Sequence, residues 1–425
     1  MKITNLVKCP ATGKADNQFV GIKISNNQIE FHYPETFQLS DNDDDLRQDI
    51  LAVLRTVSLA KTQTSDMSSY YSVQHERDAF PLGAFLWIIN DYLTYGRYEN
   101  REKVYVRGSN GRINWKRTMH SNPIISRGNI IYSDIVSETR SHKDNILTEI
   151  YYFCVQKSVD SIGWLYGIVF DPEGVDYYKL FINKKRYYLS VLNTEITHTF
   201  DDQKKMRLQN MKNIITGLDD DLVNTREIVY GVDSYDYVYE KMVDSMFSRV
   251  KNIKDFYPNA YWELVLEEKP VKSSNLRPDT VLIKNNKVYI LDAKYYRYGT
   301  TFKPGDMPDT TSIQKQITYG EYVRKVKEGL YSDVFSAFVM PYSKNENKNT
   351  SRFNRDIEFV GIGHAAWLED ENEHNRKIAA ILVDTRFLTM NYLRQNDSVI
   401  EQLIDIIEKR IAGSSSEAVL KISSP

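Results

Sequence analysis

Residues 275–296 read NLRPDTVLIKNNKVYILDAKYY and carry two aspartates and a lysine at the ends of two apolar runs. Asp279 precedes the run TVLI, Asp292 follows the run VYIL, and Lys294 lies two positions further on. Carboxylate oxygens are ligands that Mg²⁺ and Mn²⁺ prefer, and an ammonium group can stabilise charge that develops on a phosphoryl group. These residue types therefore indicate metal-dependent hydrolysis of a phosphodiester, provided that the fold brings them together.

The tetrapeptide KNNK between the two runs predicts how they pair. Asn tolerates positive φ, so Asn285 and Asn286 suit a two-residue hairpin turn. Counting outward from that turn sets Asp279 opposite Asp292, and directly opposed residues of a hairpin stand about 5 Å apart. The period of two along a strand then places Lys294 on the same face as Asp292.

Two opposed carboxylates repel each other unless a cation lies between them. We therefore expect Asp279 and Asp292 to bind Mg²⁺ or Mn²⁺, with the main-chain carbonyl of Ala293 as a further ligand and Lys294 as a catalytic residue. The alternative is an ordinary surface hairpin with polar strand ends, because a D-x-K triplet is common by chance. Pro-Asp before one strand, Asp-Ala-Lys after the next and a matching register together favour the site.

A third acid often completes such a site. Glu240, in YVYEKMVDSMF, lies on the predicted helix before the hairpin and is a candidate ligand or water-orienting group, although it can equally face solvent. The rival acids lie in WELVLEE: Glu263, Glu267 and Glu268.

Two glutamines follow the hairpin on a predicted helix, in SIQKQITYGEY. From there the amides of Gln314 and Gln316 could reach the catalytic lysine or a DNA backbone. The alternative is that both glutamines lie on the solvent-facing surface of the helix and have no such role.

Residues 97–127 carry eight Arg or Lys against two Glu, with Tyr98, Tyr105 and Trp115 interleaved and the turn RGSNGR in the middle. A basic hairpin with aromatic side chains can contact phosphates or the acidic surface of a partner. A solvated surface loop is the alternative.

Helices and short strands interleave along the chain, which predicts an α/β (α+β) layer architecture. Hydrophobic periodicity and turn residues predict the elements that follow. Strands are expected within 19–33, 260–268, 333–343, 357–363 and 377–384, and helices within 46–62, 79–96, 144–158, 204–216, 236–250, 312–329 and 398–412. In the last helix Ile400, Leu403, Ile404 and Ile407 share one apolar face.

The length of 425 residues predicts at least two domains. We expect an N-terminal partner-binding or DNA-binding region at 1–229 with a break near 90, a catalytic domain at 230–415 and a flexible tail at 416–425. The net charge of −2 means that any DNA contact comes from a local patch. Cys9 and Cys154 form no ligand cluster, and no signal or membrane-spanning segment is apparent, so a cytoplasmic protein is expected.

The pattern RPD-x12-DAKYY resembles the PD-(D/E)xK nuclease superfamily, and more closely its McrC-like and LlaJI-type restriction subunits. The segments VYEKMVDSMF and QKQITYGEY resemble the helices on either side of that site. GRINWKRTM resembles the Gly-Arg-Ile-x-hydrophobic-x-x-Thr element of the N-terminal half. The resemblance runs from about residue 80 to the C-terminus and is most specific at DAKYY.

This resemblance implies a restriction-endonuclease-like C-terminal domain, with a mixed central sheet flanked by helices after a β-rich and helical N-terminal region. It implies that Asp279 and Asp292 bind the metal and that Lys294 is catalytic. It also implies a McrB-like AAA+ GTPase or ATPase partner in an anti-phage restriction system. The candidate partner contacts lie on the basic segment: Arg107, Arg112, Trp115, Lys116 and Arg117.

The chain itself is not expected to bind a nucleotide. Thr12-Gly13-Lys14-Ala15 lacks the upstream Gly and the following Ser or Thr of a phosphate loop. Self-association is one way to bring together the two sites that cutting both DNA strands requires. Two alternatives stay open: a self-sufficient restriction endonuclease, and a non-catalytic nuclease-fold scaffold that regulates an AAA+ ring.

Overall fold

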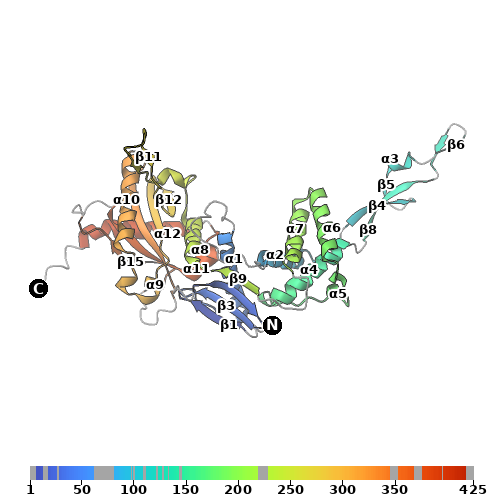
Figure 1. Cartoon of the computed structure of the whole chain (residues 1–425), viewed down its shortest axis with the longest axis horizontal. Helices are drawn as coiled ribbons and strands as arrows, with labels where there is room; N and C mark the ends of the chain where they lie inside the picture. Colours follow the sequence, from blue (N-terminus) through green and yellow to red (C-terminus); the bar gives the residue numbers. More distant parts are fainter. Residues whose placement is uncertain are drawn as a thin grey trace. The chain divides into compact units, whose positions relative to one another are not determined.

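The computed structural model describes residues 6–12, 18–25, 28–61, 81–96, 98, 101–108, 112–120, 123–126, 129–132, 134–142, 146–218, 228–344, 353–367, 376–394 and 396–417 (Figure 1). The chain forms two compact units. Unit 1 lies within His75–Arg226, and unit 2 combines residues within Thr4–Gln74 with residues within Glu227–Pro425. Within the described ranges, every helix is too short or too polar to traverse a lipid bilayer.

Unit 1 is mainly helical, with two small sheets. Its helices are α2 (Leu82–Tyr95), α3 (Trp115–Thr118), α4 (Ile146–Ile162), α5 (Tyr177–Phe181), α6 (Lys185–His198) and α7 (Asp202–Thr216), with a 3-10 turn at η1 (Gly163–Leu165). Its strands are β4 (Arg101–Arg107), β5 (Arg112–Ile113), β6 (Ile124–Ser126), β7 (Asn129–Ile131) and β8 (Val136–His142). A buried ion pair between Arg207 of α7 and Asp91 of α2, with the Tyr151 hydroxyl donating to Asp91, joins three of these helices.

A four-stranded sheet in unit 2 has the order β1-β3-β2-β9. Its strands are β1 (Leu6–Ala11), β2 (Val20–Ser25), β3 (Gln28–Pro34) and β9 (Ile228–Val232). Helix α1 (Asp43–Lys61) packs on this sheet and begins at the acidic run of SDNDDD, because carboxylates stabilise helix N-termini. Strands β2 and β3 pair antiparallel, which confirms the strands expected within 19–33, and Asn26 and Asn27 between them lie outside the described residues.

The central sheet of unit 2 has five strands in the order β12-β13-β14-β16-β15. The strands are β12 (Thr280–Lys284), β13 (Lys287–Ala293), β14 (Asp333–Tyr342), β15 (Ile357–Gly363) and β16 (Ile378–Asp384). Strands β13, β14 and β16 are parallel, and the two edge strands run antiparallel to their neighbours. This mixed sheet with helices on both faces confirms the predicted α/β class.

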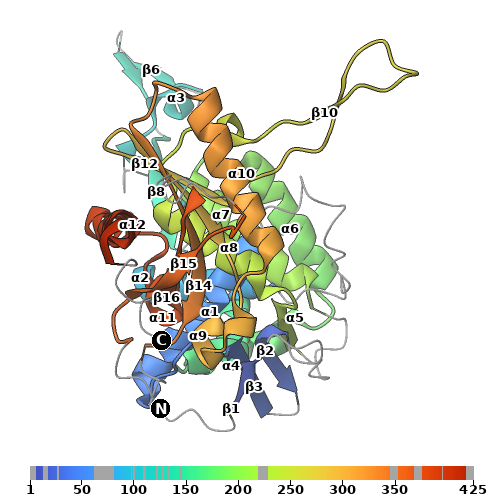
Figure 2. The same cartoon turned by 90° about the vertical axis from the view of Figure 1, so that its left-hand side faces the viewer.

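The remaining elements of unit 2 are the helices around the five-stranded sheet and the short β10–β11 hairpin, which extends away from it (Figures 1 and 2). They are α8 (Tyr235–Phe247), η2 (Ile253–Phe256), β10 (Tyr261–Trp262), β11 (Val271–Lys272), α9 (Tyr298–Thr301), η3 (Pro304–Asp306), α10 (Thr310–Val326), α11 (Thr385–Asn391) and α12 (Asp397–Glu417). Val281 and Ile290 pack against Tyr319 of α10. The alternate positions Lys287 and Tyr289 contact Glu408 of α12, so α10 and α12 cover opposite faces.

The predicted domain ranges differ from the units in one respect. The division near residue 230 is close to the boundary of the units at 226 and 227, but the described residues within 4–74 belong with the C-terminal part of the chain. Specific contacts join them: Glu35 forms a bidentate ion pair with Arg297, and buried Asp49 pairs with Arg386. A continuous catalytic domain beginning at 230 therefore omits part of the unit.

Three predicted elements also need correction. Strands β4 and β5 do not pair with each other but lie on either side of β8, so residues 97–127 do not form a simple hairpin. The predicted strand at 260–268 is reduced to the two residues of β10. The tail predicted from 416 begins inside α12, and residues 418–425 lie outside the described ranges.

Candidate active site

The hairpin β12–β13 has the predicted register. Asn285 and Asn286 have φ of 52° and 60°, as a two-residue turn of the mirror-image type requires. Lys284 pairs with Lys287, and the ladder continues to Thr280 opposite Leu291. The next positions outward are Asp279 and Asp292, so the two acids lie at the same end of the hairpin.

Asp279, which is half-buried, and Asp292, which is buried, form an acidic pair. The Asp292 side chain is 1% exposed, and its Oδ1 has no hydrogen-bond donor among the described residues. Asp279 Oδ2 accepts the main-chain N–H of Ala293 at 2.9 Å, which fixes this carboxylate beside β13. Burial, the Asp292 carboxylate and the Glu240 carboxylate together raise the pKa of Asp279 well above its usual range.

Lys294 contacts this pair directly. Its Nζ lies 2.6 Å from Asp292 Oδ2, and its main-chain N–H donates to Val339 of β14 at 2.8 Å. Burial alone would lower the pKa of Lys294, but the carboxylates of Asp292 and Asp279 outweigh that effect and raise it. The ammonium group is therefore held charged at the acidic pair.

Helix α8 brings two further acids towards the same hairpin. Glu240 acts electrostatically on Asp279, but it is partly exposed and pairs with the neighbouring Lys241 at 3.4 Å. Asp244, one helical turn later, accepts a hydrogen bond from Thr280 Oγ1 at 3.3 Å, and burial raises its pKa. Asp244 was not singled out from the sequence, although its spacing of four from Glu240 places both on one helix face.

The two candidate glutamines of α10 have different environments. Gln316 is buried, and its Nε2 donates to the main-chain carbonyl of Ile290 in β13 at 2.7 Å. Its Oε1 has no hydrogen-bond partner among the described residues. Gln314 is exposed on the same helix. Gln316 therefore supports the strand that carries Asp292, whereas Gln314 faces solvent.

The other predicted residues belong to other elements and are exposed. Glu263, Glu267 and Glu268 are exposed on the β10–β11 hairpin and its turn. The basic candidates are exposed in unit 1, where the Arg117 guanidinium stacks 3.8 Å from the centroid of the Tyr105 ring. They are Arg107, Arg112, Trp115, Lys116 and Arg117.

The donor set at the acidic pair fits a hard divalent cation. Two carboxylates lie together, and one of them has a buried oxygen without a donor, which a cation or a proton would satisfy. Within the described ranges, no three His, Cys, Asp or Glu side chains converge closely enough to hold a metal among themselves. Mg²⁺ suits such a sparse set because it retains several water ligands.

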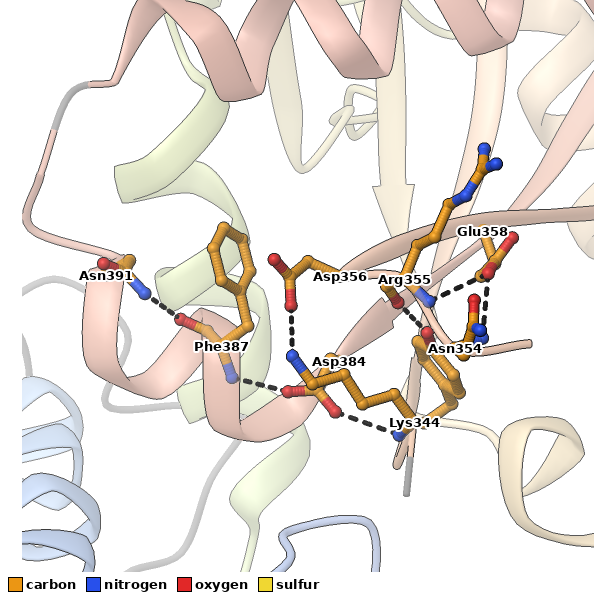
Figure 3. Close-up of polar contacts among 9 residues, drawn as sticks. Lys344, Asn354, Arg355, Asp356, Glu358, Asp384, Phe387 and Asn391 are labelled. Atoms are coloured by element: carbon orange, nitrogen blue, oxygen red, sulfur yellow. Dashed lines mark hydrogen bonds and ion pairs between the residues drawn. The ribbon is translucent and has the colours of Figure 1, made fainter. Parts of the chain in front are cut away.

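A separate pocket of about 410 Å³ lies at the carboxyl ends of β14 and β16 (Figure 3). Lys344 Nζ contacts Asp356 Oδ1 at 2.7 Å, and Asp384 accepts the main-chain N–H groups of Lys344 and Phe387. Asp384 thereby caps the short helix α11. These charges compensate one another within the fold, so the acidic pair on β12–β13 is the better candidate for chemistry.

Comparison with known proteins identifies the family. The family model of the LlaJI restriction endonuclease matches residues 19–384. No curated protein matches the chain. Among solved structures, a chain of the refined half-complex from the tetradecameric assembly of Thermococcus gammatolerans McrB AAA+ hexamers with bound McrC is similar at 15% identity and a TM-score of 0.38, over 90% of this chain and 83% of that chain.

The family match extends from β2 to the end of β16, so it includes the acidic pair, Lys294 and most of both units. A TM-score of 0.38 is too low to support an argument about the fold, so the fold class is assigned from the sheet topology. Because the match covers most of the sequence, the chain belongs to the LlaJI restriction endonuclease family.

Proposed function

We propose that the chain is a metal-dependent endodeoxyribonuclease that hydrolyses phosphodiester bonds as the cleavage subunit of an NTP-dependent, McrBC-like restriction system. The observation that carries this proposal is the pair of half-buried Asp279 and buried Asp292, with the Lys294 ammonium 2.6 Å from Asp292. Membership of a restriction endonuclease family supports DNA as the substrate.

Asp279, Asp292 and the Ala293 carbonyl would hold Mg²⁺ or Mn²⁺, with Glu240 as a further ligand through water or after a side-chain movement. A bound divalent cation supplies charge neutralisation at a phosphoryl oxygen and makes its water more acidic. Lys294 supplies a fixed positive charge beside the scissile phosphate, where negative charge increases in the transition state. Burial of the pair strengthens both effects, because water screens them less.

A partner AAA+ ATPase or GTPase is the second part of the proposal. Residues 111–118 resemble the N-terminal element of McrC-like subunits, and the basic side chains there are exposed. Exposed isoleucines on the neighbouring β6–β7 hairpin were not singled out from the sequence, and they add an apolar surface next to the basic one. They are Ile124, Ile125, Ile130 and Ile131.

Plasmid cleavage in Mg²⁺, with and without the partner and its nucleotide, tests the proposal. Wild type should cut when the partner hydrolyses nucleotide, and Asp292→Ala should not cut under any of these conditions. Asp356→Ala, an acid of the separate pocket in the same unit, is the matched control and should retain cutting. Cutting that survives Asp292→Ala unchanged would refute the site.

The same experiment separates the alternatives. Site-specific cutting without a partner would indicate a self-sufficient endonuclease. A wild-type chain that never cuts but still stimulates hydrolysis by the partner would indicate a scaffold. Arg112→Ala and Arg117→Ala should reduce that stimulation while Mn²⁺ affinity is unchanged, because these residues lie in unit 1 and the acidic pair lies in unit 2.

A further inference from the structure

Strands β10 and β11 form a narrow hairpin that extends away from the five-stranded sheet (Figure 2). Only two residue pairs form its ladder, Tyr261 with Lys272 and Trp262 with Val271. The turn beyond them holds Leu264, Val265 and Leu266, and the last two are 102% and 96% exposed. Aliphatic side chains so fully exposed at the end of an extension indicate a surface that another molecule covers.

The hairpin leads directly into the segment that carries Asp279, and two hydrogen bonds fix the connection. Ser273 N–H donates to the Ala260 carbonyl at 2.8 Å, which closes the base of the hairpin. The Tyr319 hydroxyl of α10 donates to the Arg277 carbonyl at 2.7 Å, two residues before Asp279. Only the short segment 273–278 separates the hairpin from Asp279, and α10 holds one end of that segment, which favours a polymer bound at Asp279 as the molecule that covers the hairpin.

The charges along the hairpin and its flanks suit a nucleic acid. Exposed cations, which can contact a phosphate backbone, occur on the hairpin and on the segments before and after it: Lys251, Lys254, Lys269, Lys272 and Arg277. The hairpin also carries three exposed acids, whose carboxylates can accept from the exocyclic amino groups of bases: Glu263, Glu267 and Glu268. Exposed Tyr261 and Trp262 provide flat rings for stacking on bases.

We propose that the β10–β11 hairpin inserts its aliphatic turn and aromatic pair among the bases of double-stranded DNA and thereby sets which phosphate lies at Lys294. Apolar side chains that enter a groove act as wedges between base steps and bend the duplex. The inference rests on the proposed nuclease function, since it assigns the position of the substrate at that site. It adds a DNA contact in unit 2 that is separate from the basic segment of unit 1.

The test is binding of a fluorescently labelled DNA duplex to the full chain in Ca²⁺, followed by anisotropy. Val265→Asp/Leu266→Asp and, separately, Trp262→Ala should each weaken binding about tenfold or more, as expected for loss of a stacked or inserted contact. The matched controls are Leu393→Asp and Trp367→Ala, which change side chains that are 74% and 66% exposed in the same unit. Both controls should stay within about twofold of wild type.

A second readout reports insertion itself. 2-Aminopurine placed at successive positions of the duplex should brighten where the hairpin unstacks a base, and the signal should disappear in Val265→Asp/Leu266→Asp but not in Leu393→Asp. Unchanged thermal unfolding midpoints in all four variants exclude misfolding as the cause, because the replaced side chains are exposed.

The outcomes distinguish this inference from the proposed nuclease. If wild type cuts plasmid and the hairpin variants bind and cut like it, the wedge is refuted and the nuclease stands. If binding depends on the hairpin but wild type never cuts, the DNA contact stands and the nuclease fails. Wild type that binds no duplex, or hairpin variants that lose only self-association or partner binding, would overturn the inference.

Discussion

At the scale of single residues, the main feature is a pair of carboxylates, one of whose oxygens, Asp292 Oδ1, has no hydrogen-bond donor among the described residues. The sequence could predict this pair because a two-residue turn and a period of two leave only one register for Asp279 and Asp292. The sequence could not place Glu240 and Asp244 relative to this pair. Helix α8 is separated from the hairpin along the chain, and its position beside the hairpin depends on tertiary contacts. The same limit applies to Gln316, whose buried bond to Ile290 depends on how α10 lies on the sheet.

Lys294→Met should separate metal binding from cleavage. Removing the ammonium leaves the carboxylates of Asp279 and Asp292 in place, so Mn²⁺ should bind at least as tightly as in wild type. Cleavage should fall about 100-fold to 1,000-fold, the usual loss when one preorganised electrostatic contact is removed. Single-turnover cleavage and Mn²⁺ titration measure the two effects, with exposed Lys303→Met as the control. An equal loss of Mn²⁺ affinity and of cleavage, or no loss of either, would contradict a catalytic role for Lys294.

At the scale of elements, hairpin β12–β13 is stabilised by its two-residue turn and by contacts with helix α12. Its turn uses two Asn residues with positive φ, and helix α12 fastens its outer face through Lys287 and Tyr289 to Glu408. The apolar face predicted for α12 is confirmed, since Ile400, Leu403, Ile404 and Ile407 are buried. We call the contacts of Glu408 with Lys287 and Tyr289 the polar clamp. It was not predicted, because the hydrophobic pattern of a helix does not show which strand a charged residue at the edge of its apolar face will contact.

The turn should tolerate glycine and reject a β-branched residue at position 286. Glycine has no Cβ and adopts positive φ freely, so Asn286→Gly should leave the free energy of unfolding unchanged or slightly higher. Asn286→Ile should lower the free energy of unfolding by about 1–2 kcal/mol, the cost of a left-handed conformation for such a side chain. Urea unfolding of the two variants measures the difference. Equal stability would mean that the Asn pair does not set the register.

The clamp at Glu408 should depend on pH. Burial alone would raise the pKa of Glu408, but hydrogen bonds from Tyr289 and Lys287 lower it below its usual value. A lowered folded-state pKa means that the stabilisation is complete above the unfolded-state pKa of about 4.3 and is lost as the pH falls through the folded-state value. Glu408→Gln should therefore reduce stability by about 1 kcal/mol at pH 7, and the difference should shrink below pH 4. Thermal unfolding across that range tests this, and a difference that grows at low pH would contradict it.

At the scale of the whole molecule, unit 2 is assembled from two separate stretches of the chain. Composition and periodicity could predict most helices and strands of the C-terminal part, but not that residues 4–74 complete it. That association depends on pairs such as Glu35 with Arg297 and Asp49 with Arg386, which are far apart in the sequence and follow no local pattern. The order of β4, β8 and β5 was missed for a similar reason, because β8 enters between strands that are closer in sequence.

Removing residues 1–229 should therefore prevent unit 2 from folding, since it leaves Arg297 and Arg386 without partners and removes α1 from the core. Replacing residues 75–226 by a flexible Gly/Ser linker of about 20 residues should instead leave unit 2 folded. Circular dichroism and thermal unfolding distinguish these two chains. Cooperative unfolding of the chain that lacks 1–229 would show that the N-terminal stretch is dispensable.

Mn²⁺ binding measured by electron paramagnetic resonance tests whether Asp279 and Asp292 share a divalent cation. At neutral pH the full wild-type chain should bind Mn²⁺, and Asp292→Asn should weaken that binding at least about tenfold, because one ligand charge is lost. Asp356→Asn, which changes a paired acid of the separate pocket, should bind as wild type does. No Mn²⁺ binding by wild type, or equal affinity in wild type and Asp292→Asn, would contradict the account.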